Sequence, residues 1–119
     1  MPLREPSPAH GDVEAARLAV LRLLEQQPDM SQRDLSEALG LSLGKAHYVL
    51  HSLLDKGMVK AANFRRSDNK LAYAYVLTPS GLREKIRLTR TFLSRKEEEF
   101  EQLRRTIAAL RDELPESER

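Results

Sequence analysis

Six residues between positions 42 and 51 have the types and the spacing for contacts with the base edges of a nucleic acid. If residues 42–56 form a helix, positions 44, 47, 48 and 51 lie on one side of it. A lysine there can reach guanine acceptors or a phosphate, histidine and tyrosine offer hydrogen bonds and flat contact surfaces, and a glycine allows the helix to approach closely. These candidate contact residues are Ser42, Gly44, Lys45, His47, Tyr48 and His51.

A second candidate surface is the basic segment Arg-Arg-Ser-Asp-Asn-Lys at residues 65–70. Its composition is typical of an exposed turn, and its cations could neutralise phosphates without reading a base sequence. Residues 42–82 carry six Lys/Arg against two Asp/Glu, a net charge of +4, whereas the whole chain has +2. The positive excess therefore lies where a polyanion would dock. The candidate residues of this surface are Arg65, Arg66 and Lys70.

Metal binding and catalysis have less support in the sequence. His47 and His51 are spaced so that both imidazoles could address one metal ion, but no nearby acidic residue or cysteine completes such a site. Nothing resembles a nucleophile elbow, a phosphate loop or a set of metal ligands. We therefore expect no enzyme, no cofactor and no metal. A metal or small-molecule sensor that uses the two histidines is a lesser alternative.

Two short helices joined by a glycine turn are expected to position the six candidate residues. Ser31 caps the first helix, which ends at Gly40, and Ser42 caps the second, which ends at Gly57. The residues expected to point inward are Leu35, Ala38, Leu39, Ala46, Val49, Leu50, Leu53 and Leu54.

An earlier helix should complete the core. Residues 1–11 contain three prolines and no periodic pattern, so we expect a disordered lead-in. Asp12 looks like a helix cap, and Pro28 should stop the helix near Gln27. Its apolar stripe comprises Val13, Ala16, Val20, Leu21, Leu23 and Leu24.

A β-hairpin is expected from residues 58–64 and 71–77, because the second segment alternates strictly between two faces. Its tyrosines, Tyr73 and Tyr75, are expected to pack rather than to stack on bases. The order of these elements predicts a winged helix-turn-helix domain over residues 12–78. A helix of this fold fits the DNA major groove.

The last predicted element is one long helix over residues 79–114, followed by a tail at 115–119. Thr78 caps it and Pro79 takes its first position, where a missing N–H is not needed. Apolar residues then recur in steps of four and three, which is coiled-coil spacing, interrupted by Thr89 and Lys96. Because a single helix cannot bury such a seam, we expect a homodimer, with the relative direction of the two helices left open. The expected dimerisation residues are Leu82, Ile86, Leu93, Phe100, Leu103, Ile107, Leu110 and Leu114.

The composition of the chain indicates the cellular compartment in which the protein functions. The chain has 119 residues and no cysteine, which excludes disulfides and thiolate metal sites and fits a reducing compartment. No apolar run approaches the roughly 20 residues that span a bilayer, and the N-terminus lacks the apolar segment of a signal peptide. We therefore expect a cytoplasmic protein without a membrane partner.

Several stretches are distinctive beyond a general winged-helix pattern: Leu39–Lys45, Lys56–Lys60, Asn63–Arg65, Asn69–Tyr75, Leu77–Gly81 and Arg90–Lys96. They resemble the exopolysaccharide-associated branch of the MarR-family transcriptional regulators, and the resemblance covers roughly residues 12–112. The resemblance implies a bacterial double-stranded-DNA-binding regulator linked to genes for exopolysaccharide synthesis or export, with the six helix residues on the recognition helix and Arg65, Arg66 and Lys70 on the wing. The short, proline-rich N-terminus departs from the typical pattern of the family, so no effector pocket is carried over. The rival hypothesis is a winged-helix protein-interaction module that docks through its long helix onto a larger partner.

Overall fold

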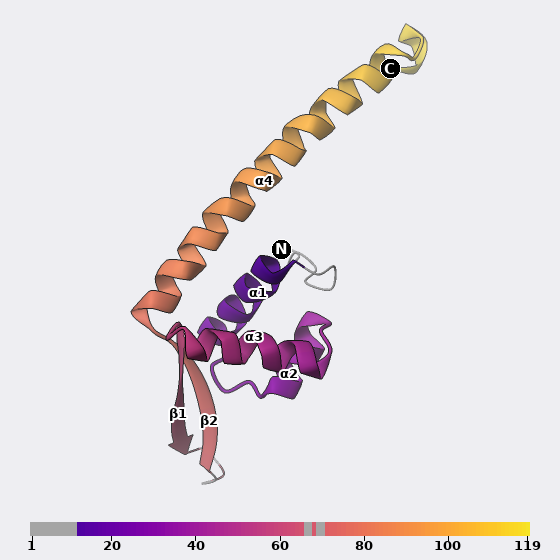
Figure 1. Ribbon diagram of the computed structural model, residues 1–119. Helices are drawn as coiled ribbons and strands as arrows, with labels where there is room; N and C mark the ends of the chain where they lie inside the picture. Colours follow the sequence, from indigo (N-terminus) through magenta and orange to yellow (C-terminus); the bar gives the residue numbers. More distant parts are fainter. Residues whose placement is uncertain (1–11, 66–67, 69–70) are drawn as a thin grey trace. The chain divides into compact units, whose positions relative to one another are not determined.

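The computed structural model describes residues 12–65, 68 and 71–119, so the lead-in expected at residues 1–11 lies outside the described residues. The predicted fold class is confirmed: helices with one antiparallel hairpin and a long C-terminal helix (Figure 1). The elements are α1 (Val13–Gln26), α2 (Gln32–Leu39), α3 (Leu43–Asp55), β1 (Val59–Arg65), β2 (Leu71–Leu77), α4 (Pro79–Asp112) and the 3-10 helix η2 (Glu116–Glu118).

The chain divides into two compact units within α4. The first unit ends at Leu88 and contains α1, α2, α3, the hairpin and the start of α4, while the second unit is Thr89–Arg119. The sequence analysis placed a boundary at residue 79 instead, at the start of the long helix.

Helix α1 begins and ends where the sequence predicts. The Asp12 side chain accepts hydrogen bonds from the backbone N–H groups of Glu14 (3.0 Å) and Ala15 (3.3 Å), which satisfies two donors that the first helical turn leaves open. The helix ends at Gln26, before Pro28. These two local signals fix the length of the helix independently of its packing.

The core of the first unit lies between α1, α2, α3 and the hairpin, since α1 contacts α2, α3 and β2, and α3 also contacts α2 and β1. Two side chains expected to point inward are exposed instead. Val13 occupies the first position of α1, and Ala38 lies on the outer side of α2, a helix of eight residues that turns only Leu35 and Leu39 inward. The largest fully buried side chains are Leu21, Leu24, Leu35, Leu50, Leu53, Leu88, Val20 and Val59.

The turn between α2 and α3 is locked by backbone geometry and by both polar groups of Leu41. Gly40 has φ +66°, in the left-handed region that glycine adopts without a steric cost. The Leu41 N–H donates to the Ser36 carbonyl (3.0 Å), and the Ser36 hydroxyl donates to the Leu41 carbonyl (2.5 Å). Leu41 itself is buried. This turn therefore sets the direction in which α3 leaves α2.

The start of α4 is joined to the end of α3 through Thr78. The Thr78 hydroxyl donates to the Gly57 carbonyl (2.6 Å) and accepts from the Gly81 N–H (3.1 Å), while the Thr78 N–H donates to the Met58 carbonyl (3.0 Å). Gly81 packs directly on Met58, because a Cβ built at Gly81 would lie 2.0 Å from the Met58 carbonyl oxygen. This junction holds the hairpin and the first turn of α4 against α3.

The hairpin pairs as the alternation predicts, with a register that runs from Val59 opposite Leu77 to Arg65 opposite Leu71. The other edge of β2 forms a hydrogen bond with the loop after α1, because the Tyr75 N–H donates to the Pro28 carbonyl (2.8 Å). The expectation that Tyr73 packs is wrong: its side chain is 67% exposed, whereas Tyr75 is half-buried. The loop after α1 therefore covers the edge of β2 at residue 75.

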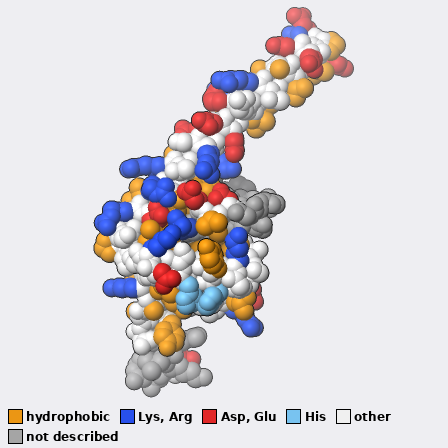
Figure 2. All heavy atoms as spheres, viewed as in Figure 1, with side chains coloured by type: hydrophobic (Ala, Val, Ile, Leu, Met, Phe, Trp, Pro, Cys, Tyr) orange, Lys and Arg blue, Asp and Glu red, His pale blue; other side chains and the backbone are white. Residues whose placement is uncertain are grey.

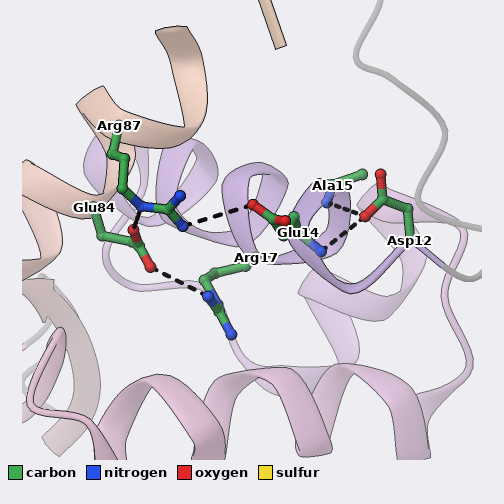
Figure 3. A network of polar contacts seen from close by, with 6 residues as sticks. All are labelled: Asp12, Glu14, Ala15, Arg17, Glu84 and Arg87. Carbon is green, nitrogen blue, oxygen red and sulfur yellow. Dashed lines mark hydrogen bonds and ion pairs between the residues drawn. The ribbon is translucent and has the colours of Figure 1, made fainter. Parts of the chain in front are cut away.

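A buried carboxylate joins α4 to α1. Glu84 is 9% exposed, and its two oxygens accept from Arg17 (3.2 Å) on α1 and Arg87 (2.5 Å) on α4 (Figure 3). Arg87 also pairs with Glu14 (3.6 Å). The hydrogen bond from Arg87 lowers the pKa of the Glu84 carboxyl below its ordinary value, with the charges of both arginines adding to the effect. The network therefore keeps Glu84 ionised in a nearly buried position.

The second unit is helical to Asp112, two residues before the predicted end, and η2 lies in what the sequence analysis took as a tail. Its apolar side chains are exposed, apart from the half-buried Phe92. Leu82 and Ile86, on the outer side of α4 in the first unit, are exposed as well. The inner side of α4 in the first unit is formed by a different set of residues, Gly81, Glu84 and Leu88.

Candidate nucleic-acid interface

The structure brings all six candidate contact residues of α3 to one region of the surface. Ser42, Gly44, His47, Tyr48 and His51 are exposed, and Lys45 is half-buried. Tyr48 is 64% exposed, a large fraction for an aromatic side chain. The opposite side of the same helix forms part of the core through Ala46, Val49, Leu50 and Leu53. Helix α3 is thus anchored on one side and free to make contacts on the other.

The N-terminal end of α3 is ordered by its cap. The Ser42 hydroxyl accepts from the Lys45 N–H (3.1 Å), so the Ser42 side chain is already engaged in holding the helix. A Cβ built at Gly44 would meet no atom within 4 Å. Packing within the chain therefore does not explain the glycine, and its effect is to leave the first turn of α3 open to close approach.

The two histidines lie side by side on the exposed face, where Figure 2 shows them in pale blue. Their ring centroids are 4.0 Å apart and the ring planes are tilted by 34°. His47 is also held from α2, since its Nδ1 lies 3.0 Å from the Oε1 of Gln32. The rings are therefore positioned by neighbours on two helices.

A shallow groove follows the exposed face toward the C-terminal end of α3. Its volume is about 410 Å³, and the end of the groove carries one acidic and one basic residue. The lining side chains are His47, Tyr48, His51, Ser52, Asp55 and Lys56. Hydrogen-bonding groups and flat rings predominate, which suits contact with a polar, planar partner such as a base edge.

The candidate residues of the wing are described only in part. Arg65 is the last residue of β1, and the structure describes its backbone but not its side chain; Arg66 and Lys70 lie outside the described residues. Tyr73 on β2 projects an exposed ring close to that end of the hairpin, opposite Asn63.

Two residues of this region were missed by the sequence analysis. Leu43, the first residue of α3, is 50% exposed beside the polar face, and its spacing of four residues from His47 could have indicated it. Gln32 lies 15 residues from His47 in the sequence, and no local pattern points to their contact. It depends on how α2 and α3 cross.

Within the described part of the chain, no three His, Cys, Asp or Glu side chains gather in a way that could hold a metal ion. None of the described helices has the length and apolar character needed to cross a membrane.

Comparison with known families identifies the arrangement. Residues 14–60, from α1 into β1, match the family model described as winged helix-turn-helix DNA-binding. The fold is a winged helix-turn-helix. In this fold α3 is the second helix of the motif and the hairpin is the wing. A comparison with curated protein sequences gives no match.

Solved structures of MarR-type regulators share this fold. A MarR transcriptional regulator from Methanosarcina mazei Go1 superposes with a TM-score of 0.58 and 20% identity, over 82% of this chain and 72% of that one. A MarR/EmrR family transcriptional regulator from Acinetobacter sp. ADP1 gives 0.55 and 22%, over 81% and 72%. The S. aureus MepR–DNA complex gives 0.55 and 20%, over 87% and 78%. At these identities the likeness concerns the fold alone.

Proposed function

We propose that this protein is a sequence-specific double-stranded-DNA-binding transcription regulator of the MarR family, acting as a homodimer on genes for exopolysaccharide synthesis or export. The observation that carries the proposal is the exposed polar face of α3. Four of its residues, Gly44, His47, Tyr48 and His51, follow helical spacing on the second helix of a helix-turn-helix. A solvated face without function needs neither an open glycine nor two ordered imidazoles.

The comparisons support the coarser part of the proposal. The matching family model is described as DNA-binding, and one structure of the same fold is that of MepR in complex with DNA. The proposed contacts place α3 in a major groove and the hairpin tip on the adjacent backbone. Arg65, Arg66 and Lys70 would then neutralise phosphates. Because chromosomal DNA lies in the bacterial cytoplasm, we place the protein there.

The link to exopolysaccharide genes is supported by the resemblance of several stretches, among them Asn69–Tyr75 and Leu77–Gly81, to that branch of the family. Thr78 and Gly81 in the second stretch join α3 to α4 (Overall fold). Footprinting of genomic DNA with the purified protein tests this part. Sites upstream of exopolysaccharide genes are the expected result, and sites confined to unrelated genes would reject the assignment.

The homodimer is supported by the apolar stripe of α4. A two-fold dimer would bind a roughly palindromic site with half-sites one or two helical turns apart. A glutamate in the seam would bury an unpaired charge, so Phe100→Glu is expected to give monomers in sedimentation equilibrium. Glu98→Gln, an exposed change on the same helix, should leave the dimer intact. If the Phe100→Glu variant remained a dimer, the apolar stripe of α4 would not be the dimer interface.

Fluorescence anisotropy with specific and scrambled duplexes across a salt series tests the assigned roles. Lys45→Ala or Tyr48→Ala should reduce discrimination by about 1–3 kcal/mol, because base contacts specify sequence. Arg65→Ala combined with Arg66→Ala should weaken binding to all duplexes alike and flatten the salt dependence. Arg105→Ala, which removes an exposed charge in the second unit, serves as the control.

Two results would contradict the proposal. A wing variant that changed only specificity would show the roles to be wrongly assigned. Failure of the wild-type protein to shift any duplex, its own upstream DNA included, would favour the rival function, a winged-helix module that docks onto a larger protein through α4.

A further inference from the structure

We propose that Gln32 is a positioning residue that fixes the tautomer of His47, so that His47 selects adenine or cytosine at the base it contacts. The inference rests on the proposed DNA-binding function, and it adds a specificity determinant from outside the recognition helix.

The contact between the two side chains sets the position of the imidazole proton. The Nδ1 of His47 lies 3.0 Å from the Oε1 of Gln32. An amide oxygen accepts hydrogen bonds and cannot donate them, so this contact is a hydrogen bond only in the tautomer whose Nδ1 carries the proton. A neutral imidazole holds a single ring proton, and its Nε2 is therefore left as an acceptor.

The backbone that carries Gln32 is itself held in place. Gln32 follows Ser31 directly, and Ser31 forms a reciprocal capping box with Asp34: the Asp34 N–H donates to the Ser31 hydroxyl (3.0 Å), and the Ser31 N–H donates to an Asp34 carboxylate oxygen (3.0 Å). The first turn of α2 is thus ordered before any ligand binds. Gln32 is half-buried, so its side chain also has less freedom than an exposed glutamine.

The other side of the His47 ring is occupied by His51. With ring centroids 4.0 Å apart, the two imidazoles form a tilted stack along α3. His47 is therefore held through Nδ1 by one helix and through its ring face by another residue of its own helix. The remaining ring nitrogen, Nε2, is the one available to a partner on the exposed face.

An Nε2 acceptor discriminates between bases in the major groove. Adenine N6 and cytosine N4 are donors there, whereas guanine O6 and N7 and thymine O4 are acceptors that would face the lone pair of Nε2. Without Gln32 the proton could also lie on Nε2, which would then donate a hydrogen bond. The ring could therefore pair with bases of either class. The expected consequence of Gln32 is a preference of about fivefold at one base position, the ratio that one neutral hydrogen bond sustains.

The tautomer is tested first in the free protein. Long-range ¹⁵N correlation spectra at pH 8.5, where a free imidazole is neutral, distinguish the two tautomers, and a His47→Asn variant identifies the signals. We expect wild-type His47 as the Nδ1–H form, a mixture in Gln32→Met, and the Nδ1–H form again in Gln32→Glu, whose carboxylate also accepts. Gln26→Met, the same change at an exposed position of α1, should have no effect. An Nε2–H form in the wild-type protein would overturn the inference.

Selection from a randomised duplex pool at the same pH tests the specificity. The position read by His47 is the one whose preference disappears in His47→Ala. There the wild-type protein should favour adenine or cytosine, Gln32→Met should lose about fivefold of that preference, and Gln32→Glu should retain it at lower overall affinity. An unchanged preference in a folded Gln32→Met, or selection of guanine or thymine by the wild-type protein, would overturn the inference alone. If the wild-type protein enriched no sequence while the spectra showed the expected tautomers, the proposed function would fall instead.

Discussion

Most leucine side chains described in the first unit are covered by their own chain, with Leu43 and Leu82 as exceptions, whereas those of the second unit are exposed. Leu50 in α3 and Leu88 in the first unit's part of α4 are fully buried. Leu93 and Phe100, further along the same helix, are 57% and 59% exposed. The spacing of these residues is equally regular in both units. Periodicity therefore indicates an apolar face, and only the fold shows whether the chain itself covers that face.

The difference also concerns what holds each unit together. The first unit has a packed core, an ion-pair network around the buried Glu84, and a helix-turn-helix whose turn is held by hydrogen bonds. The second unit is held by its own helix, with exposed pairs three residues apart such as Lys96 with Glu99 (3.1 Å) and Glu101 with Arg104 (3.4 Å). Pairs of this kind contribute only about 0.2–0.5 kcal/mol each. The first unit is therefore held together by its own contacts, whereas the second unit would gain stability from the partner helix that the proposed homodimer supplies.

The largest effect on the first unit is expected from Gly81→Ala. The added Cβ would lie 2.0 Å from the Met58 carbonyl oxygen, so the backbone at the junction of α3 and α4 would have to move. We expect a loss of about 4 kcal/mol or more in the free energy of unfolding, or no folded protein. Urea unfolding followed by tyrosine fluorescence measures it, because Tyr48, Tyr73 and Tyr75 all lie in the first unit.

Gly44→Ala is the control for that experiment. It makes the same substitution in the first turn of α3, where a new Cβ meets nothing within 4 Å, and it should raise stability by about 0.5–1 kcal/mol. Equal losses for the two variants would mean that close packing at Gly81 is not the cause.

A second prediction contrasts a buried and an exposed apolar residue directly. Leu50→Ala should cost the first unit about 3 kcal/mol, since it removes a fully buried side chain and leaves a cavity. Phe100→Ala should leave the tyrosine-monitored transition unchanged at concentrations where the protein is monomeric. If Phe100→Ala destabilised that transition as much as Leu50→Ala does, the two units would not be energetically separate.

Ionisation of Glu84 gives a smaller, pH-dependent effect. Its folded pKa is lowered below the ordinary value of 4.5, chiefly by the hydrogen bond from Arg87. The stabilisation is therefore fully present above about pH 4.5 and is lost as the pH falls through the lower folded value. Glu84→Gln should cost about 1–2 kcal/mol at pH 7, and the difference from the wild type should shrink on acidification.

Urea titrations at several pH values measure this difference. Glu97→Gln, an exposed change in the second unit, should have no such pH dependence. A wild-type and Glu84→Gln difference that stayed constant from pH 7 to pH 3 would show that the charge of Glu84 is not what stabilises the unit.

Local signals in the sequence predicted the secondary structure closely. The caps at Asp12, Ser31 and Ser42 and the left-handed glycines at Gly40 and Gly57 are where the sequence analysis expected them. Each of these depends on residues within a few positions along the chain, so a sequence contains the information directly.

Contacts between distant segments could not be predicted in the same way. Gly81 against Met58 and Gln32 against His47 join residues far apart in the sequence, and neither pair has an apolar pattern. Glu84 reads as a surface residue because charged side chains are seldom buried, yet Arg17 and Arg87 keep it in place. The spacing of residues thus predicted that the candidate residues of α3 share an exposed face, but it did not predict the α2 side chain that contacts His47.

The smallest predicted effect compares a serine of each unit. Ser31→Ala removes the capping box of α2, a helix of only eight residues that cannot spread the loss over a long hydrogen-bonded ladder, and should lower the stability of the first unit by about 1 kcal/mol. Ser94→Ala places alanine inside the long α4, where serine has no capping role. It should raise the stability of the helix by a few tenths of a kcal/mol, and with it the helical content. Tyrosine fluorescence follows the first variant and circular dichroism the second. Opposite signs for the same substitution would show that the stability of α2 depends on its N-terminal cap and that of α4 on the helix propensity of its interior residues. A loss of stability in both variants would mean that Ser94 makes a contact that stabilises the second unit.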